Sequence, residues 1–146
     1  MRTLVLIKPD GVARSKIGAI ISRFEDKGLK VTALKLMKLD RERAEKHYAV
    51  HKGKPFYESL LNYITSAPLV AMVVEGNNCI EIVRKLVGAT NGAKAEPGTI
   101  RGDFSTGIDF NLIHASDSEE SAKYEIPIFF DEKEILTYER ADRDWL

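Results

Sequence analysis

The sequence predicts an α/β chain of the α+β type, a ferredoxin-like β-α-β-β-α-β arrangement in which helices cover one face of a four-stranded antiparallel sheet. The first supporting observation is that apolar stretches of strand length alternate with amphipathic helical patterns in this order. The second is the glycine-rich segment 88–107, which has no periodicity and precedes the last strand as a long loop. We expect one domain, residues 1–146.

Local signals indicate the first strand and the first helix. The apolar run Thr3–Lys8 is followed by Pro9–Gly11, which predicts a buried strand and then a turn. Apolar residues recur at helical spacing from Ile17 to Phe24, and Gly28 stands where a C-terminal cap belongs. The chain is therefore expected to begin with a strand, a turn and a helix of about three turns.

A second strand and two short helices are expected next. Residues 29–39 alternate between apolar and polar with one slip, directly after Ala33, which predicts a bulge. Asp40 is placed to cap a polar helix that ends at His47. A further helix is expected to open at Pro55, with a shared apolar face formed by Phe56, Leu60, Leu61 and Ile64.

The second half of the chain begins with the most apolar strand. Residues 68–75 are apolar on both faces, which is typical of a central strand. We expect Asn78 to cap the following helix and Gly88 to end it. The buried side of this helix is predicted to consist of Ile80, Val83, Leu86 and Val87.

The last strand is predicted to run directly into a helix. Phe110, Leu112 and Ile113 have the apolar character of an inner strand. Ser116 and Glu119 fit a capping box, which predicts a helix from there to about residue 125. The tail, residues 126–146, is expected to wrap the surface or to pack on a partner chain.

Composition limits the function classes. Lys plus Arg and Asp plus Glu both number 22, so no global basic field favours nucleic acid or a membrane. Cys79 is the only cysteine, and the apolar run at the N-terminus is too short for a signal peptide or a membrane span. Neither a Walker A sequence nor G-x-G-x-x-G occurs. We expect a cytoplasmic chain without a membrane partner or a specific nucleic-acid partner.

His114 stands where the last strand meets the following helix. A lone histidine at a strand end usually donates to a backbone carbonyl in the core. The alternative is that Glu125 folds back and holds one ring nitrogen, which leaves the other as a nucleophile. For Glu125, this role and that of a solvated charge at a helix end are equally compatible with the sequence.

Three cations are candidates for binding phosphate. Lys8 ends a buried strand and must emerge at the edge of the sheet, Arg84 lies on the helix before the long loop, and Arg101 lies in that loop. Each by itself has the character of a surface charge. If the loop folds over the strand ends, the three would converge on a polyphosphate, because arginine and lysine both bind phosphate oxygens.

Aromatic residues and histidines give weaker signals. Tyr48 and Phe56 flank a polar stretch, and Phe56 is either a core residue or an exposed platform for a nucleobase. His47 and His51 have i, i+4 spacing, but no third ligand completes a zinc pattern. The sequence therefore predicts no metal ligands from the protein.

Four segments taken together resemble one family. They are KPDGV at 8–12, HY followed by KPF within 47–56, PGTIRGDF at 97–104 and NLIHASDS at 111–118. In order and spacing they resemble the nucleoside diphosphate kinases over nearly the whole chain. The resemblance implies a ferredoxin-like fold and transfer of the γ-phosphate of a nucleoside triphosphate to a nucleoside diphosphate. The route it implies is ping-pong, through a phosphohistidine.

The resemblance also implies a role for each matching residue. His114 is expected to carry the phosphate, Glu125 to hold its far ring nitrogen, and Ser116 to bond to that glutamate. Asn111 is expected to contact the ribose hydroxyl, and Phe56 to stack on the base. The remaining matches are phosphate contacts and apolar neighbours of the base, namely Lys8, Tyr48, Arg84, Thr90, Arg101, Leu60 and Ile108.

A cofactor and an assembly follow from the same resemblance. Mg²⁺ is expected, held mainly by the substrate phosphates, in a homo-oligomer for which a hexamer is favoured over a tetramer. Val50 departs from the family because many relatives carry Glu or Asp there, near the magnesium shell. Gly92 stands where a proline is usual, which should loosen the start of the loop. We expect activity to survive both departures.

Two alternatives keep the fold but change the function. The β-α-β-β-α-β order is shared with small RNA-binding domains, although this chain has no aromatic-rich strand of the RNA-binding type and no net basic charge. An inactive regulatory relative is the other alternative. The intact set of residues around His114 argues against it.

Overall fold

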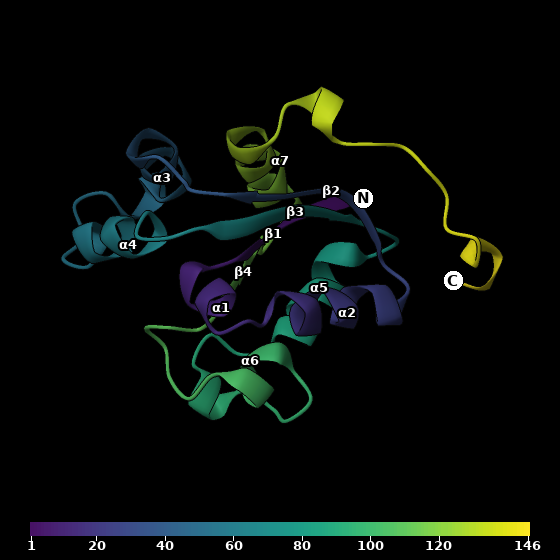
Figure 1. Ribbon diagram of the computed structural model, residues 1–146, viewed down its shortest axis with the longest axis horizontal. Helices are drawn as coiled ribbons and strands as arrows, with labels where there is room; N and C mark the ends of the chain where they lie inside the picture. Colours follow the sequence, from purple (N-terminus) through teal and green to yellow (C-terminus); the bar gives the residue numbers. More distant parts are fainter.

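A four-stranded antiparallel sheet lies at the centre of the computed structural model, which describes residues 1–146 (Figure 1). Its spatial order is β2-β3-β1-β4, so β3 and β1 are the central strands and β2 is an edge. Helices α1 and α2 connect the first two strands, and α5 and α6 connect the last two. With α2 and α5 as the main connecting helices, the strand order confirms the ferredoxin-like arrangement. The strands are β1 Arg2–Ile7, β2 Lys30–Met37, β3 Leu69–Glu75 and β4 Ile113–Ala115.

Helices cover both faces of the sheet, not one as predicted. In Figure 1, α2 and α5 lie on one side of the strands and α7 lies on the other. None of the helices combines the length and apolar character needed to cross a bilayer. They are α1 Pro9–Ala13, α2 Ile17–Lys27, α3 Arg41–His47, α4 Tyr57–Ile64, α5 Cys79–Val87, α6 Ile100–Phe104 and α7 Glu119–Phe129, with 3₁₀ turns at Ala49–His51, Gly92–Lys94, Glu132–Glu134 and Arg143–Trp145.

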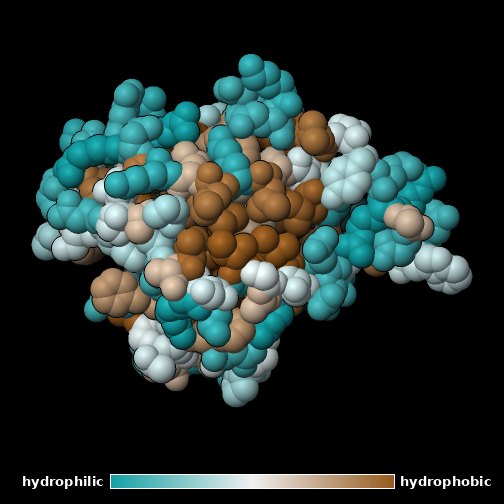
Figure 2. All heavy atoms as spheres, in the orientation of Figure 1, coloured by the Kyte–Doolittle hydropathy of each residue, from teal (hydrophilic) through white to brown (hydrophobic).

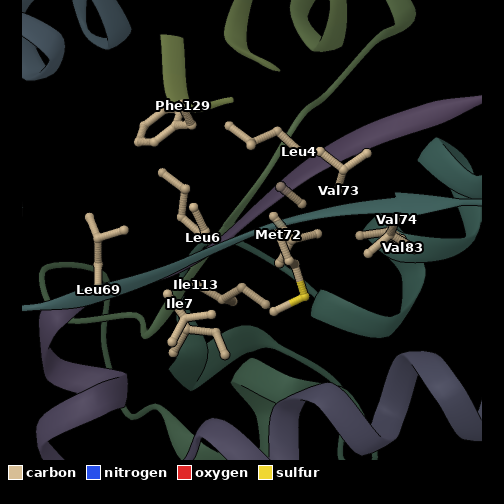
Figure 3. Close-up of a cluster of buried hydrophobic side chains, with 14 of the residues drawn as sticks. Leu4, Leu6, Ile7, Leu69, Met72, Val73, Val74, Val83, Ile113 and Phe129 are labelled. Carbon is tan, nitrogen blue, oxygen red and sulfur yellow. The ribbon is translucent and has the colours of Figure 1, made fainter. Parts of the chain in front are cut away.

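The hydrophobic core is built on both faces of the central strands. In Figure 3, Leu4 and Leu6 point toward Phe129 of α7, while Ile7 and Met72 point to the opposite side of the sheet. All five side chains are less than 2% exposed. A strand covered on both faces must be apolar at every position, which is why residues 68–75 were recognisable as a central strand.

The C-terminal helix begins and ends later than the sequence predicted. The N-cap is Ser118, whose hydroxyl accepts the Ser121 N–H at 3.0 Å, and the helix continues to Phe129. Ser116 does not cap this helix because its side chain is fully buried and accepts the Leu4 N–H at 3.2 Å. The capping box with Glu119 is therefore wrong.

Other boundaries differ for local reasons. Asn78 precedes α5 with a φ of 56° and makes no side-chain cap, so that prediction is wrong. Residues Pro9–Gly11 belong to the short helix α1 instead of a turn. Helix α4 begins at Tyr57, and Phe56 is its exposed N-cap residue, not part of its apolar face.

Asp40 caps α3 as predicted, through its bond with the Arg43 N–H at 2.8 Å. Gly28 ends α2 in the left-handed conformation, also as predicted.

The bulge of β2 and the tail of the chain belong together. The register of β2 against β3 shifts between Val31 and Ala33, one residue pair earlier than predicted. The Thr32 carbonyl accepts the Leu136 N–H at 2.9 Å, and the Val31 carbonyl accepts the Tyr138 O–H at 2.5 Å. The tail therefore wraps the chain's own surface at this end of β2.

Gly92 is held closely by the end of the long loop. Its N–H donates to the Gly107 carbonyl at 2.8 Å, and a Cβ at this position would lie 2.5 Å from the Ser105 carbonyl oxygen. The absence of a side chain therefore has a packing reason, and a proline would also remove the N–H. The expectation that Gly92 loosens the loop is not what these contacts indicate.

We expect Gly92→Ala to lower the free energy of unfolding by about 1–3 kcal/mol, because backbone atoms must move to admit the new methyl group. Urea unfolding would measure the change. The matched control is Gly18→Ala on α2, where a Cβ meets nothing within 4 Å. That variant should be neutral or more stable by up to about 1 kcal/mol. Equal stability of Gly92→Ala and the parent chain would contradict the packing argument.

Candidate active site

A histidine and a glutamate form a hydrogen-bonded pair between β4 and α7. The Nε2 atom of His114 lies 2.9 Å from Oε1 of Glu125, and the two side chains are 23% and 13% exposed. The hydroxyl of Ser116 donates to the same carboxylate oxygen at 2.7 Å. Because Nε2 bonds to a carboxylate, the neutral ring carries its proton there and keeps a lone pair on Nδ1.

The ring of His114 is one end of a chain of aromatic contacts. His47 meets it edge to face with ring centroids 4.7 Å apart, and Tyr48 lies 4.7 Å from His47. His51 continues the chain at 6.1 Å from Tyr48, and Phe56 lies 5.3 Å from His51. Helix α3 and the turn after it thus connect the nucleophile candidate to the proposed base platform.

Burial changes the pKa of two of these side chains, Tyr48 and His47. Burial, with the charge of Glu125 as a smaller cause, raises the pKa of Tyr48 to about 12, so its hydroxyl remains a donor. Burial also lowers the pKa of His47 well below the usual range, and positive charge on His114 and Lys8 lowers it further. Both nitrogens of His47 lack a hydrogen-bond partner, and the ring is 6% exposed. His47 is therefore an uncharged ring that packs against His114.

The three cations predicted from the sequence come together at this edge of the sheet. Burial lowers the pKa of Lys8 to about 8, and the charge of Arg101 contributes to the decrease. Burial likewise lowers the pKa of Arg101 to about 10, with the charge of Arg84 as the second cause. Burial is the larger cause in both cases, but the charge contributions show that the three cations lie near one another. An anion bound among them would offset their repulsion.

Arg101 is the most buried of the three cations, at 4% exposed. Its guanidinium donates to the backbone carbonyls of Asn111, Gly88 and Ile113, at 3.3, 3.3 and 2.6 Å. It therefore joins the start of the long loop to the residues before His114. Arg84 is less buried and donates to the Ala115 carbonyl at 3.2 Å, on the other side of His114.

Asn111 connects the first strand to the long loop. Its side-chain oxygen accepts from Nζ of Lys8 at 2.9 Å, and its amide donates to the Thr90 carbonyl at 2.9 Å. Asn111 is 4% exposed, whereas Thr90 is exposed. The long loop is thereby held against the end of β1, next to the cations.

The residues predicted to surround a nucleobase lie at the exposed outer part of the candidate site. Phe56 is 46% exposed and Ile108 is 56% exposed, so both offer apolar surface to a ligand. Leu60 on α4 is partly buried and packs against the core. For Phe56, the exposure favours the platform over the core residue. Phe110 was predicted to belong to an inner strand, and that prediction is wrong, because it lies before β4 and is 65% exposed, with its ring 5.4 Å from the Tyr63 ring.

One cluster has atoms that could ligate a metal. His47, His114 and Glu125 have ligand atoms within 4.8 Å of one another. Two imidazoles suit zinc or copper, whereas Mg²⁺ prefers an octahedral set of oxygens. Val50 is 74% exposed and offers no oxygen ligand. These donors do not form an oxygen cage, so an Mg²⁺ ion would have to be held mainly by the phosphates of a substrate.

Sequence reasoning missed the place of two histidines. His47 and His51 were considered only as a metal pair, yet both belong to the ring chain that leads from His114. The signal that could have found them is their position beside Tyr48, within one of the four family segments. Their spacing could not reveal it, because the partner ring of His47 lies 67 residues further along the chain.

Comparison with known proteins agrees with this geometry. The family model described as nucleoside diphosphate kinase matches residues 1–135. The chain is 61% identical to the nucleoside diphosphate kinase of Thermoplasma acidophilum over 141 residues, which cover 97% of this chain and 95% of that one.

Solved structures of the same family have nearly the same fold. The halophilic nucleoside diphosphate kinase of Halobacterium salinarum in complex with CDP has a TM-score of 0.97 at 47% identity, and the match covers 99% of this chain and 97% of that one. A transition-state mimic of the enzyme from Borrelia burgdorferi, with vanadate and ADP, has a TM-score of 0.92 at 44% identity, covering 98% and 94%.

A carboxylate-held histidine among converging cations, at the edge of an antiparallel sheet, has the chemistry expected of a phosphotransferase site. The match over residues 1–135 makes the assignment specific, since it includes every element that supplies this site. The chain belongs to the nucleoside diphosphate kinase family.

Proposed function

We propose that this chain transfers the γ-phosphate of a nucleoside triphosphate such as ATP to a nucleoside diphosphate, through a phosphohistidine at His114. The observation that carries the proposal is the 2.9 Å bond between Nε2 of His114 and Glu125, made among converging cations. This bond fixes the tautomer whose free lone pair is on Nδ1. The same geometry serves both halves of a ping-pong exchange.

His114 attacks the γ-phosphorus with the Nδ1 lone pair, and the bond to the leaving diphosphate breaks as the N–P bond forms. Positive charge grows on the ring during attack, and Glu125 stabilises it through Nε2. Ser116 holds the carboxylate in place by its bond to Oε1. In the second half, a different diphosphate takes the phosphoryl group from Nδ1 by the reverse step, and the lone pair returns to the ring.

Lys8, Arg84 and Arg101 offset the negative charge of the transferring group and the leaving diphosphate. The Tyr48 hydroxyl and Thr90 add donors to the phosphates. We propose Mg²⁺ as the cofactor, carried by the phosphates, where it supplies further charge neutralisation. The protein contributes positioning, because phosphoryl transfer requires little covalent chemistry beyond the nucleophile.

The nucleotide is proposed to lie with its base on the exposed ring of Phe56, beside Leu60 and Ile108. Asn111 is proposed to contact the ribose hydroxyl. Its side chain bridges Lys8 and the loop, beside the proposed phosphate site. Stacking uses the flat face of a base and few of its edges, so the site is expected to accept several bases. The CDP and ADP bound in the structures of relatives support this proposal.

The experiment that tests the phosphohistidine is incubation with γ-labelled ATP, followed by denaturation and chemical characterisation of the label. Acid-labile and base-stable label on the chain is the expected result. Label of the same amount on a His114→Ala variant would overturn the proposal. If the chain binds single-stranded RNA and is not labelled, the result would instead favour the nucleic-acid-binding alternative.

Lys8 gives the activity an alkaline limit. Because the pKa of Lys8 is about 8, the free enzyme loses this charge above that pH. We expect kcat/KM to fall above about pH 8, approaching tenfold per pH unit. A pH series between 6 and 10 would measure it.

The matched variant for this limit is Lys8→Arg, whose guanidinium remains charged at pH 10. Its alkaline limb should move to higher pH. An unchanged limb in Lys8→Arg would show that another group causes the decrease.

We propose a homo-oligomer, a hexamer before a tetramer. Figure 2 shows apolar residues gathered at the centre of the view, where Figure 1 shows the strands between α7 on one side and α2 and α5 on the other. Leu34 and Leu36, on the edge strand β2, are 54% and 63% exposed, and exposed apolar edges favour association. A mass measurement in solution would test it. A cytoplasmic location is also proposed, which the single free thiol of Cys79 supports.

A further inference from the structure

The backbone before His114 makes a tight and strained turn. Leu112 has a φ of 68°, and the Ile113 N–H donates to the Asn111 carbonyl at 2.8 Å. A hydrogen bond that spans one residue of positive φ defines a γ-turn of the rare, strained kind. Leu112 is fully buried. The turn therefore lies inside the fold, directly between Asn111 and the strand that carries His114.

Helix α1 holds both peptide groups of Leu112. The Leu112 N–H donates to Oδ2 of Asp10 at 3.1 Å, and the Leu112 carbonyl accepts the Lys8 backbone N–H at 2.7 Å. The other carboxylate oxygen of Asp10 accepts the Tyr63 hydroxyl, so α4 holds Asp10 in turn. Gly11 permits this approach, since a Cβ there would lie 2.8 Å from Ile7 and 3.1 Å from the Leu112 carbonyl.

A strained conformation persists only where its surroundings hold it from several sides. Without the Asp10 acceptor, the Leu112 N–H would be left unsatisfied in the interior, and the turn could relax. Relaxation would move Asn111 on one side and His114 on the other. A displacement of about 1 Å at a reacting group can lower the rate about 100-fold.

Asp10 is also a charge beside Lys8. Burial lowers the pKa of Lys8 and the charge of Arg101 lowers it further, whereas the Asp10 carboxylate raises it. The other titratable groups around Lys8 are Tyr63, whose ring centroid lies 5.8 Å from Nζ, and His47, which is uncharged. Asp10 is therefore the negative charge that acts on this ammonium group.

We propose that Asp10 is a positioning residue for phosphoryl transfer, which fixes the Leu112 turn between Asn111 and His114 and supplies a negative charge beside Lys8. The proposal deepens the function given above and rests on the roles of His114 and Lys8 there. Tyr63 supports Asp10 and does not face the substrate. Asp10 touches no reacting atom and acts through the backbone and through charge.

Two variants separate the two effects. Asp10→Asn keeps an acceptor for the Leu112 N–H and removes the charge, whereas Asp10→Ala removes both. We expect Asp10→Asn to keep kcat within about threefold at pH 6.5 and to shift the alkaline limb of kcat/KM to lower pH. We expect Asp10→Ala to lower kcat about 100-fold at pH 6.5. Asp26→Asn and Asp26→Ala, at an exposed position, are the controls and should change neither quantity.

The results decide between positioning and simple structural support. Parent-like kcat in folded Asp10→Ala would overturn the role of the turn. An unshifted alkaline limb in Asp10→Asn would overturn the role of the charge, even if Asp10→Ala does not fold. Urea unfolding of each variant reports the fold separately. Failure of the phosphohistidine itself would be seen in the labelling of His114→Ala, which does not involve Asp10.

Discussion

Replacement of His114 by glutamine is expected to lower kcat/KM by more than about 10⁴-fold, because the amide has no nucleophilic lone pair to accept the phosphoryl group. The loss should fall on the chemical step and leave nucleotide binding nearly unchanged, since the cations and Phe56 remain. Stopped-flow measurement of ADP formation in a single turnover, together with equilibrium binding of ADP, would separate the two.

The fold is expected to tolerate this change. His114 is partly exposed, and glutamine can still donate to Glu125, so no buried carboxylate is left without a partner. The free energy of unfolding should change by about 1 kcal/mol or less. Substantial turnover in a well-folded His114→Gln variant would contradict the assignment of the nucleophile.

Replacement of Arg101 by lysine is also expected to lower activity, by less than the loss of His114, although the charge is kept. One ammonium group cannot reach the three carbonyls of Asn111, Gly88 and Ile113 that the guanidinium fork joins. We expect kcat/KM to fall by about 100-fold or more, because the phosphate site and the turn before His114 both lose their positions.

Stability should fall as well, by about 2–4 kcal/mol, since buried carbonyls lose their donor. Urea unfolding and steady-state kinetics would measure the two losses on the same preparation. Arg43→Lys is the matched control, because that side chain is 43% exposed and its ion pair with Asp40 spans 3.7 Å. It should change neither quantity. Full activity of Arg101→Lys would show that charge alone is needed at this position.

The replacements of His114 and Arg101 affect different functions of the same candidate active site. In the proposed reaction, His114 supplies the electron pair, while Arg101 holds the loop and the strand end in contact around it. Burial of the charged Arg101 side chain destabilises the fold, as its lowered pKa indicates. A bound phosphate would offset this destabilisation, because its negative charge favours the charged guanidinium. A site whose buried positive charges are stabilised by a bound anion favours the binding of highly charged nucleotides.

Local sequence signals determined much of the fold. The apolar run 68–75 became β3, Asp40 capped α3, and Gly28 ended α2 in the left-handed conformation. Each of these depends on side chains within a few residues of one another, or on a strand that is covered on both faces. The local patterns and the family segments likewise indicate the nucleophile candidate, His114, and the cations around it from the sequence alone.

Signals of the same kind failed where a distant contact competed. Ser116 has the local pattern of an N-cap, but its hydroxyl bonds to Leu4 and Glu125, and Ser118 caps instead. Phe56 shares a helical spacing with apolar neighbours, yet it lies exposed at the start of α4. Short-range patterns cannot show which of two partners a polar group will choose.

The sequence by itself determined the order of the strands and helices and the residues that could perform the chemistry. Only the tertiary structure decided that Lys8 bonds to Asn111, 103 residues away, and that Asp10 holds Leu112, 102 residues away. It also decided that α7 covers the second face of the sheet (Figure 1). The physical reason is that these contacts form across antiparallel neighbours β1 and β4, whose pairing depends on the burial of the whole sheet.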